Sequence, residues 1–298
     1  MHHKIAIIGV GLLGGSLGLA LQQRGVCVTG YFRSQISADA ALQLGIVTHA
    51  TTELKNAVSN QDIIILCTPI AQMPPICREI LPYLNPHTIV SDVGSTKKQL
   101  VQELHSILTQ ANCHYVGAHP MAGSEKIGMQ HATANLFQNA LCLLTPIKET
   151  NQEALRIIEK IWYEIGCRTQ ILSPEEHDRL VCRASHLPHL LAAALVRHVL
   201  EAMDPRETNP EAQKTQKLQN SICASGFRDT TRVASGSPEM WRDIIISNRE
   251  EIYKEITTFR ADIDDVANLI QSGTEKEIYT FFTRARNLRN NWIDQHRS

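Results

Sequence analysis

The chain has 298 residues, of which 43% are hydrophobic and 20% charged, a balance typical of a globular protein long enough for two domains. Its formal net charge is −1, so no basic field argues for a nucleic-acid partner. No apolar run approaches the length of a membrane span and no signal peptide precedes Lys4, so we expect neither membrane insertion nor export.

The eight cysteines are scattered along the chain and form no CxxC pair. This spacing disfavours a zinc ribbon or a disulfide framework and suits reduced thiols. We therefore expect a cytoplasmic protein. His2 and His3 enter none of the arguments below.

The first predicted element is a short apolar strand over residues 4–8, which leads into a GxGxxG segment, Gly9–Gly14. A predicted helix follows over residues 15–24, and a second strand over residues 26–31. In this context the glycines predict a dinucleotide site, with phosphates at the helix N-terminus. The alternative is a glycine-rich turn without a ligand. The residues expected to bind the cofactor here are Gly9, Gly11, Leu12, Leu13 and Gly14.

The end of the second strand carries the signal for cofactor specificity. An NAD site expects an acidic residue there, but the first acidic residue of the chain is Asp39. Arg33 and Ser34 stand at the expected place, and an arginine fork suits a 2′-phosphate. We predict NADP, with NAD as the alternative cofactor. The competing interpretation of Arg33 is a solvated surface arginine.

Two further strands are predicted in the middle of the chain. One covers residues 62–67 and ends in Thr68 and Pro69, which we expect to contact the cofactor. The other covers residues 87–93 and is followed by Ser95 and a predicted helix. Ser95 either caps that helix or turns its hydroxyl to the ligand, and the local sequence does not decide between them.

The segment Gly117–Gly128, GAHPMAGSEKIG, holds the candidate catalytic histidine, His119, directly after a short apolar run. A strand ending in this way points the imidazole off the carboxyl end of a sheet, where open α/β sheets bind ligands. An imidazole titrates near neutrality, so it is suited to passing a proton. The alternative is a loop histidine bonded to its own backbone.

Strands over residues 141–146 and 170–172, with a helix over 151–165 between them, complete the alternating pattern. The predicted fold is α/β, with a Rossmann-type doubly wound parallel sheet in a dinucleotide-binding domain, residues 1–172. No convincing strand follows, so residues 173–298 are predicted to form a second, all-α domain.

That second domain begins with a helix capped by Ser173, with Pro174 at its first position. Pro188 lies inside the helix and should kink it. His177, His186 and His189 invite a metal interpretation, but no HEXXH and no carboxylate in register accompany them, so we expect no metal.

A glycine-interrupted turn with two arginines, a helix beginning at Ser237 and two long helices follow. Arginines within residues 224–232 are natural carboxylate clamps, although singly such residues are more often surface salt-bridge partners. The helices over residues 248–270 and 274–297 have charged faces typical of solvated surfaces. Their apolar faces are suited to a partner subunit.

Several motifs now stand in a particular order: GxGxxG, Gly94-Ser95, GAHPMAGSEKIG, His177-Asp178, SHLPH at 185–189, FRDTTR at 227–232 and Met240-Trp241-Arg242-Asp243. Together they resemble the prephenate/arogenate dehydrogenase family of tyrosine biosynthesis, over about residues 4 to 260. The resemblance implies oxidative decarboxylation of prephenate or arogenate with NAD(P), and a homodimer formed through the helical domain.

The resemblance also implies residue roles. His119 matches the histidine that accepts the proton of the substrate's ring hydroxyl, and Ser95 matches the serine that bonds both that hydroxyl and the histidine. Arg232 matches an arginine that binds substrate carboxylate, and His189 matches a histidine near the other end of the substrate. The remaining expected substrate contacts are Ser185, in the SHLPH motif, and Glu125, at the mouth of the site.

Two alternatives remain at this point. Another two-domain NADP-dependent reductase, of the hydroxyacid or pyrroline-carboxylate kind, would share the first domain but gives no reason for the HPMAG and SHLPH segments. A non-enzymatic NADP-binding sensor would bind the cofactor without turnover. In the sensor, His119 and Ser95 are ordinary loop residues.

Overall fold

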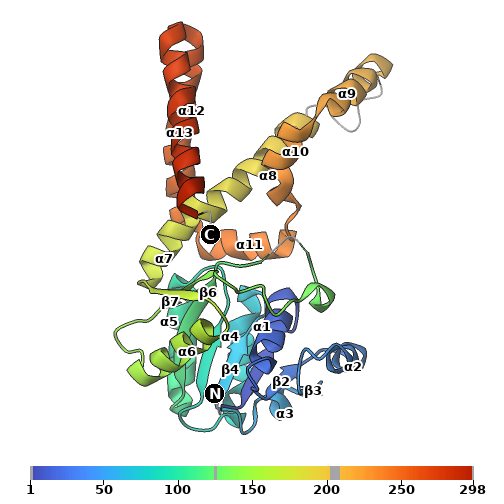
Figure 1. Ribbon diagram of the computed structural model, residues 1–298, viewed down its shortest axis with the longest axis vertical. Coiled ribbons are helices and arrows are strands. Elements are labelled where there is room, and N and C mark those ends of the chain that lie inside the picture. The colour runs from blue at the N-terminus through green and yellow to red at the C-terminus, as the bar shows by residue number, and fades with distance from the viewer. Residues whose placement is uncertain (1–2, 124–125, 202–208, 297–298) are drawn as a thin grey trace. The chain divides into compact units, whose positions relative to one another are not determined.

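The protein is described by a computed structural model that covers residues 3–123, 126–201 and 209–296 (Figure 1). By their internal contacts the residues fall into two compact units, one ending at Arg249 and one beginning at Glu250. Each unit is described by itself below. The predicted domain boundary after residue 172 lies within the first unit and stays a prediction.

The first unit holds an eight-stranded sheet in the order β3-β2-β1-β4-β5-β6-β7-β8. The strands are β1 Ile5–Ile8, β2 Val28–Tyr31, β3 His49–Thr51, β4 Ile63–Leu66, β5 Ile89–Asp92, β6 His114–Pro120, β7 Leu141–Thr145 and β8 Arg168–Ile171. The first six are parallel and follow the Rossmann order. The predicted doubly wound sheet is confirmed, with one difference: β7 pairs antiparallel to β6 and parallel to β8.

Successive residues of a strand point to opposite faces of the sheet. The strands have buried apolar side chains on both faces, and helices cover each face. Ile5 and Ile7 of β1 belong to one buried cluster, and Ala6 and Ile8 belong to the other. The first cluster includes residues of α1 Leu12–Gln22, α2 Gln35–Gln43 and α6 Gln152–Glu164. The second includes residues of α3 Leu54–Val58, α4 Met73–Ile80 and α5 Lys98–Leu108.

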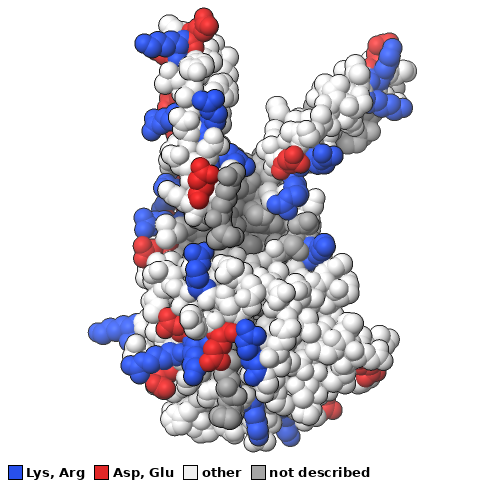
Figure 2. All heavy atoms as spheres, in the orientation of Figure 1, with Lys and Arg blue, Asp and Glu red and all other residues white. Residues whose placement is uncertain are grey.

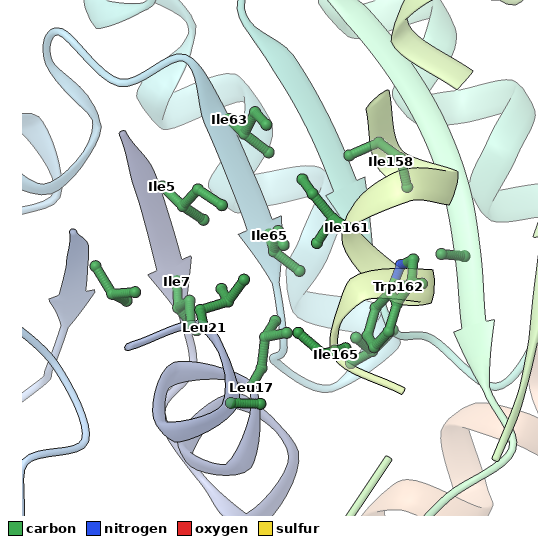
Figure 3. Close-up of a cluster of buried hydrophobic side chains, with 14 of the residues drawn as sticks. Ile5, Ile7, Leu17, Leu21, Ile63, Ile65, Ile158, Ile161, Trp162 and Ile165 are labelled. Atoms are coloured by element: carbon green, nitrogen blue, oxygen red, sulfur yellow. The ribbon is translucent and has the colours of Figure 1, made fainter. Parts of the chain in front are cut away.

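The core between β1, β4, α1 and α6 is made of large buried apolar side chains (Figure 3). Isoleucines of the two central strands meet Leu17 and Leu21 of α1, and Trp162 of α6 closes the cluster. Trp162 is fully buried and meets Phe137 edge to face, with ring centroids 5.3 Å apart. This packing fixes the positions of the central strands. It thereby also fixes the carboxyl ends of these strands, where the candidate site residues lie.

A helical segment follows the sheet within the first unit, and the described residues from 173 onward contain no strand. Ser173 caps α7 Pro174–Val181 as predicted, because its hydroxyl accepts the Glu176 amide proton at 3.1 Å. The remaining helices of this unit are α8 Leu187–Leu200, α9 Pro210–Ile222, α10 Ser225–Thr231 and α11 Pro238–Ser247.

Where a kink at Pro188 is predicted, the structure has a π-helical turn, Cys182–His186, between α7 and α8. Proline has no amide proton and its ring crowds the carbonyl four residues earlier. A π turn just ahead of Pro188 is one way for a helix to pass a proline, and such turns are frequent at functional sites. The chain thus leaves α7 and enters α8 with a changed register.

The second unit is a helical hairpin formed by α12 Arg249–Ser272, whose first residue ends the first unit, and α13 Glu275–His296. Figure 2 shows acidic and basic side chains interspersed on the visible face of these helices. Large apolar side chains are also exposed on the hairpin, among them Ile263, Ile270 and Phe282. Among the described residues, no helix combines the length and the apolar character that a membrane span requires.

Candidate active site

In the glycine turn after β1, Gly9 and Gly14 pack closely against neighbouring atoms, whereas Gly11 borders open space. A Cβ added to Gly9, whose φ is +97°, would lie 2.7 Å from the Cys67 carbonyl carbon, and one added to Gly14 would strike the Gly9 oxygen. A Cβ at Gly11 would meet no described atom within 4 Å. The backbone at Gly11 is therefore open to the close approach that a dinucleotide would need.

The start of α1 fits a pyrophosphate in its chemistry as well. Gly11 is its N-cap and provides no side-chain cap, and the first turn, which includes Leu12, Leu13 and Gly14, contains no acidic residue. Helix N-termini with free amides and no competing carboxylate favour anions. The chemistry of this helix start therefore fits an anionic group such as a phosphate.

Thr68 and Pro69 come directly after β4, next to the same turn. The Thr68 methyl group lies 2.8 Å from where a Gly9 Cβ would stand. The Thr68 hydroxyl is buried and has no hydrogen-bond partner among the described residues. A buried hydroxyl without a partner is costly, and a ligand in the turn is one group that would satisfy it.

The end of β2 presents the predicted specificity residues at the surface. Phe32 is buried, whereas Arg33 and Ser34 are exposed. Ser34 caps α2, since its hydroxyl accepts the Ser37 amide proton at 3.3 Å and donates to the Ser37 hydroxyl at 3.0 Å. Asp39, the first acidic residue, lies one turn into α2 and accepts a proton from the Gln35 side chain.

His119 lies near the carboxyl end of β6, as predicted, and is buried with 8% of its surface exposed. Its Nδ1 is 2.9 Å from Nε2 of His177, and Nδ1 of His177 is 2.8 Å from Oδ1 of Asp178. His177 and Asp178 come from α7, 58 residues or more further along the chain. The three side chains form a buried series that ends at His119.

Asp178 connects this series to the start of α5. Its Oδ1 accepts the Lys97 amide proton at 2.7 Å, and its Oδ2 accepts the Lys98 amide proton at 2.9 Å. Asn248 donates to the Asp178 carbonyl at 3.0 Å and lies 3.3 Å from Nδ1 of His186. His177-Asp178 is one of the ordered motifs of the sequence, but no local pattern indicates these distant partners or a role for the pair.

A second buried pair lies beside it. The Lys97 ammonium is fully buried and donates to Asp92 at 2.5 Å and to the Gly94 carbonyl at 2.6 Å. Asp92 also accepts protons from the Tyr115 hydroxyl and from the Ala118 amide. Asp92 thus connects β5 to β6 one residue before His119, and the ion pair is satisfied on both sides.

Burial keeps the histidines of this region neutral. It lowers the pKa of His119 well below 6.5, and the neighbouring His177, Lys97 and His186 lower it further. Burial also lowers the pKa of His177, although its hydrogen bond to Asp178 opposes the shift. Burial lowers the pKa of His186 to about 4. At neutral pH, His119 is therefore available as a proton acceptor.

The residues predicted to bind substrate have different surroundings. His189 lies against Trp241, with ring centroids 4.3 Å apart, and its Nδ1 is 2.9 Å from the carbonyl of Ser185, which is half-buried in the π turn. Arg232 is exposed at the end of α10. Glu125 lies outside the described residues.

Ser95, the second predicted catalytic residue, is half-buried in the turn between β5 and α5. Within the described part of the chain, no hydrogen bond joins it to His119, whose ring bonds to His177 instead. It does not cap α5, whose N-cap is Lys97. The described residues also contain no group of three His, Cys, Asp or Glu side chains placed to hold a metal.

The chain matches two family models in succession. Residues 17–171 match the nucleotide-binding domain of prephenate dehydrogenase, and residues 173–284 match the prephenate dehydrogenase dimerization domain. A prephenate dehydrogenase of Bacillus subtilis is 32% identical over 97% of this chain and 76% of its own length. A cyclohexadienyl dehydrogenase of Zymomonas mobilis is 31% identical over 96% of this chain and 94% of its own length.

Solved structures agree with these matches. The prephenate dehydrogenase of Aquifex aeolicus, in complex with hydroxyphenyl propionate and NAD+, superposes with a TM-score of 0.87, 30% identity and 98% of each chain covered. The arogenate dehydrogenase of Synechocystis superposes with a TM-score of 0.80 and 30% identity, over 97% of this chain and 99% of that one. The resemblance seen in the motifs is confirmed, and the chain belongs to the prephenate dehydrogenase family.

Proposed function

We propose that this chain catalyses the oxidative decarboxylation of prephenate to 4-hydroxyphenylpyruvate, or of arogenate to tyrosine, with release of CO2 and reduction of NADP. The observation that carries the proposal is His119, which lies at the carboxyl end of β6 with a neutral ring. The glycine turn after β1 lies at the same edge of the parallel sheet. The relatives named above are prephenate, cyclohexadienyl and arogenate dehydrogenases, and they match almost the whole of this chain. This similarity favours neither the sensor nor the hydroxyacid-reductase alternative.

The chemistry asks the protein for one base and for orientation. His119 accepts the proton of the ring hydroxyl as the carbon that bears this hydroxyl gives up a hydride. A bound nicotinamide supplies the hydride acceptor. The bond between ring and carboxylate then breaks, CO2 leaves, and the electron pair of that bond makes the ring aromatic. Aromatisation provides the driving force, so positioning accounts for most of the protein's work.

Ser95 and four further residues complete the proposed site. Ser95 is assigned to hydrogen-bond the substrate hydroxyl, and Arg232 is assigned to clamp a substrate carboxylate. His189, Ser185 and Glu125 are assigned to the remainder of the substrate. His189 suits this role because its ring is held in place by Trp241 and by the Ser185 carbonyl.

For the cofactor, we favour NADP over NAD. Arg33 is exposed at the end of β2 and directly precedes the N-cap of α2, where the helix dipole also favours an anion. No acidic residue precedes Asp39, so no carboxylate is placed to bind the ribose 2′-hydroxyl in the way NAD sites use. Gly9, Gly11, Leu12, Leu13, Gly14, Thr68 and Pro69 are assigned to the shared part of the dinucleotide.

We also propose that two copies of the chain associate through the apolar face of the α12 and α13 hairpin. A groove of about 1070 Å³ on the hairpin is lined partly by Phe259, Ile263 and Phe281. Ile263→Glu should yield monomers in sedimentation velocity, because a charge in an apolar interface costs affinity. Tyr163→Glu changes an even more exposed large side chain, in α6 outside the hairpin, and serves as the control. A dimeric Ile263→Glu variant would reject this interface.

The proposed reaction is tested by absorbance at 340 nm, with NADP or NAD and with prephenate, arogenate or 3-hydroxyisobutyrate as substrate. We expect NADP reduction with prephenate or arogenate, matched by an equal amount of 4-hydroxyphenylpyruvate or tyrosine. Turnover of the hydroxyacid alone would favour the reductase alternative. Cofactor binding without any turnover would favour the sensor.

A further inference from the structure

The hydrogen bonds around Asp178 have a fixed direction. Backbone amides only donate, so both carboxylate oxygens of Asp178 act as acceptors, from Lys97 at 2.7 Å and from Lys98 at 2.9 Å. The same Oδ1 lies 2.8 Å from Nδ1 of His177. Because Oδ1 of Asp178 is an acceptor, Nδ1 of His177 must carry a proton and donate it to this oxygen.

The direction passes on to His119. A neutral imidazole carries one proton, so a protonated Nδ1 leaves Nε2 of His177 as an acceptor. Nε2 of His177 lies 2.9 Å from Nδ1 of His119. Nδ1 of His119 must therefore donate, and the lone pair of His119 remains on Nε2, the nitrogen that bonds no described residue in this series.

We propose that His177 and Asp178 are positioning residues, which hold His119 in the tautomer that leaves Nε2 free to accept the substrate proton. The proposal rests on the proposed role of His119 as the base. It assigns His177 and Asp178 no contact with substrate: Asp178 orients His177, and His177 orients His119.

The surroundings support a neutral and fixed series. His177 and Asp178 are 0% and 1% exposed, so water does not compete for their hydrogen bonds. Among the described residues, the charged and titratable groups around the two rings include Asp178 itself, Asp92 at the end of β5, Lys97 before α5 and His186 in the π turn. Asp92 pairs with Lys97, so the positive charge of Lys97 is compensated within the cluster.

The orientation of Asp178 is itself fixed from three sides. Its carboxylate binds the first amides of α5, its carbonyl accepts a proton from Asn248 after α11, and its side chain is buried in α7. The Asp178 carboxylate therefore presents its Oδ1 to His177 in a single orientation. Loss of the tautomer control in a related Asp–His arrangement costs about 10⁴-fold in kcat, since the histidine then presents a proton where a lone pair is required.

Two variants of His177 separate positioning from a structural role. The amide oxygen of Gln stands near the place of Nε2, so His177→Gln keeps an acceptor for His119, whereas His177→Leu removes it. We expect His177→Leu to lower kcat by about 10²-fold or more, with His177→Gln retaining most of the rate. KM for NADP should stay unchanged in both. His114→Leu, at the start of the same strand as His119, is the control and should keep full activity.

Equal losses in His177→Gln and His177→Leu, or no loss in either, would overturn the proposal. Because a buried leucine there risks the fold, a second measurement uses the unaltered protein. Long-range ¹H–¹⁵N correlation spectra of ¹⁵N-histidine-labelled protein report which ring nitrogen carries the proton, and the His119→Asn spectrum assigns the signals.

We expect His119 to be protonated at Nδ1 and unprotonated at Nε2 in the wild-type protein at pH 8. A proton on Nε2 would overturn the proposal whether or not the protein turns over substrate. The expected tautomer in a protein that reduces no NADP with prephenate or arogenate would support the positioning claim and reject the proposed function instead. The two failures are thus distinguishable.

Discussion

The two polar regions at the carboxyl edge of the sheet are built in opposite ways. Arg33 and Ser34, after β2, are exposed, and the Ser34 hydroxyl bonds to Ser37, three residues away. His119, at the end of β6, is buried and bonds to His177 of α7, 58 residues away. The first region depends on local sequence and the second on tertiary contacts, so a substitution should have local effects in one and wide effects in the other.

The largest effect is expected at His119. His119→Asn removes the proton acceptor and should lower kcat by about 10²- to 10⁴-fold, the usual range for a lost general base. The 340 nm assay measures it at saturating NADP and substrate. His114→Asn is the matched control, since His114 opens the same strand. A His119→Asn variant with wild-type kcat would remove His119 from the mechanism.

The buried region should also lose stability in acid. The pKa of His186 is lowered to about 4 in the folded protein, whereas the unfolded chain binds a proton near 6.5. The folded state is therefore at its full stability above pH 6.5 and is destabilised progressively down to about pH 4, by about 3 kcal/mol from this residue alone.

Urea unfolding between pH 8 and pH 5 measures this loss. His186→Asn should flatten the pH dependence, while His131→Gln, which changes an exposed histidine, should leave it unchanged. An unaltered slope in His186→Asn would show that another group causes the acid sensitivity.

These contrasts indicate what the sequence alone was able to predict. The glycine turn, the doubly wound sheet and the capped start of α7 follow from short patterns, and the structure confirms the sheet and the cap. The three-residue strand β3 is too short and too exposed to give a periodic signal. The antiparallel direction of β7 depends on a connection that no local pattern specifies.

In the candidate site, His119 was predictable because it ends a strand within a glycine-containing segment. Its partners were not. His177 and Asp178 read as helix residues, and only the fold brings them to β6 and to the start of α5. Lys97 and Asp92 give the same lesson, because charged residues are expected at the surface and these two are fully buried.

A smaller effect is expected at the substrate clamp. Arg232→Ala should raise KM for prephenate or arogenate by about 30-fold and change kcat little, because a charge-assisted bond to a carboxylate is lost. Arg228→Ala is the matched control, since Arg228 is an exposed arginine of α10, one turn before Arg232. An unchanged KM in Arg232→Ala would reject the clamp.

The smallest effect is expected in the exposed region after β2. Arg33→Ala should raise KM for NADP by about tenfold and leave KM for NAD unchanged, because only NADP has a 2′-phosphate to bind. Arg156→Ala, an exposed arginine of α6 paired with Glu153, should change neither. Equal changes for the two cofactors, or a wild-type preference for NAD, would contradict the assignment of Arg33.

The pH dependence of kcat/KM, measured for the wild-type protein and for His119→Asn, tests most directly whether a neutral imidazole at the sheet edge accepts the substrate proton. Because the pKa of His119 is held well below 6.5 by burial, the wild-type acid limb should have a slope of one and a midpoint below pH 6.5. The limb should vanish in His119→Asn. An identical limb in both proteins, or a wild-type midpoint above pH 6.5, would contradict the account.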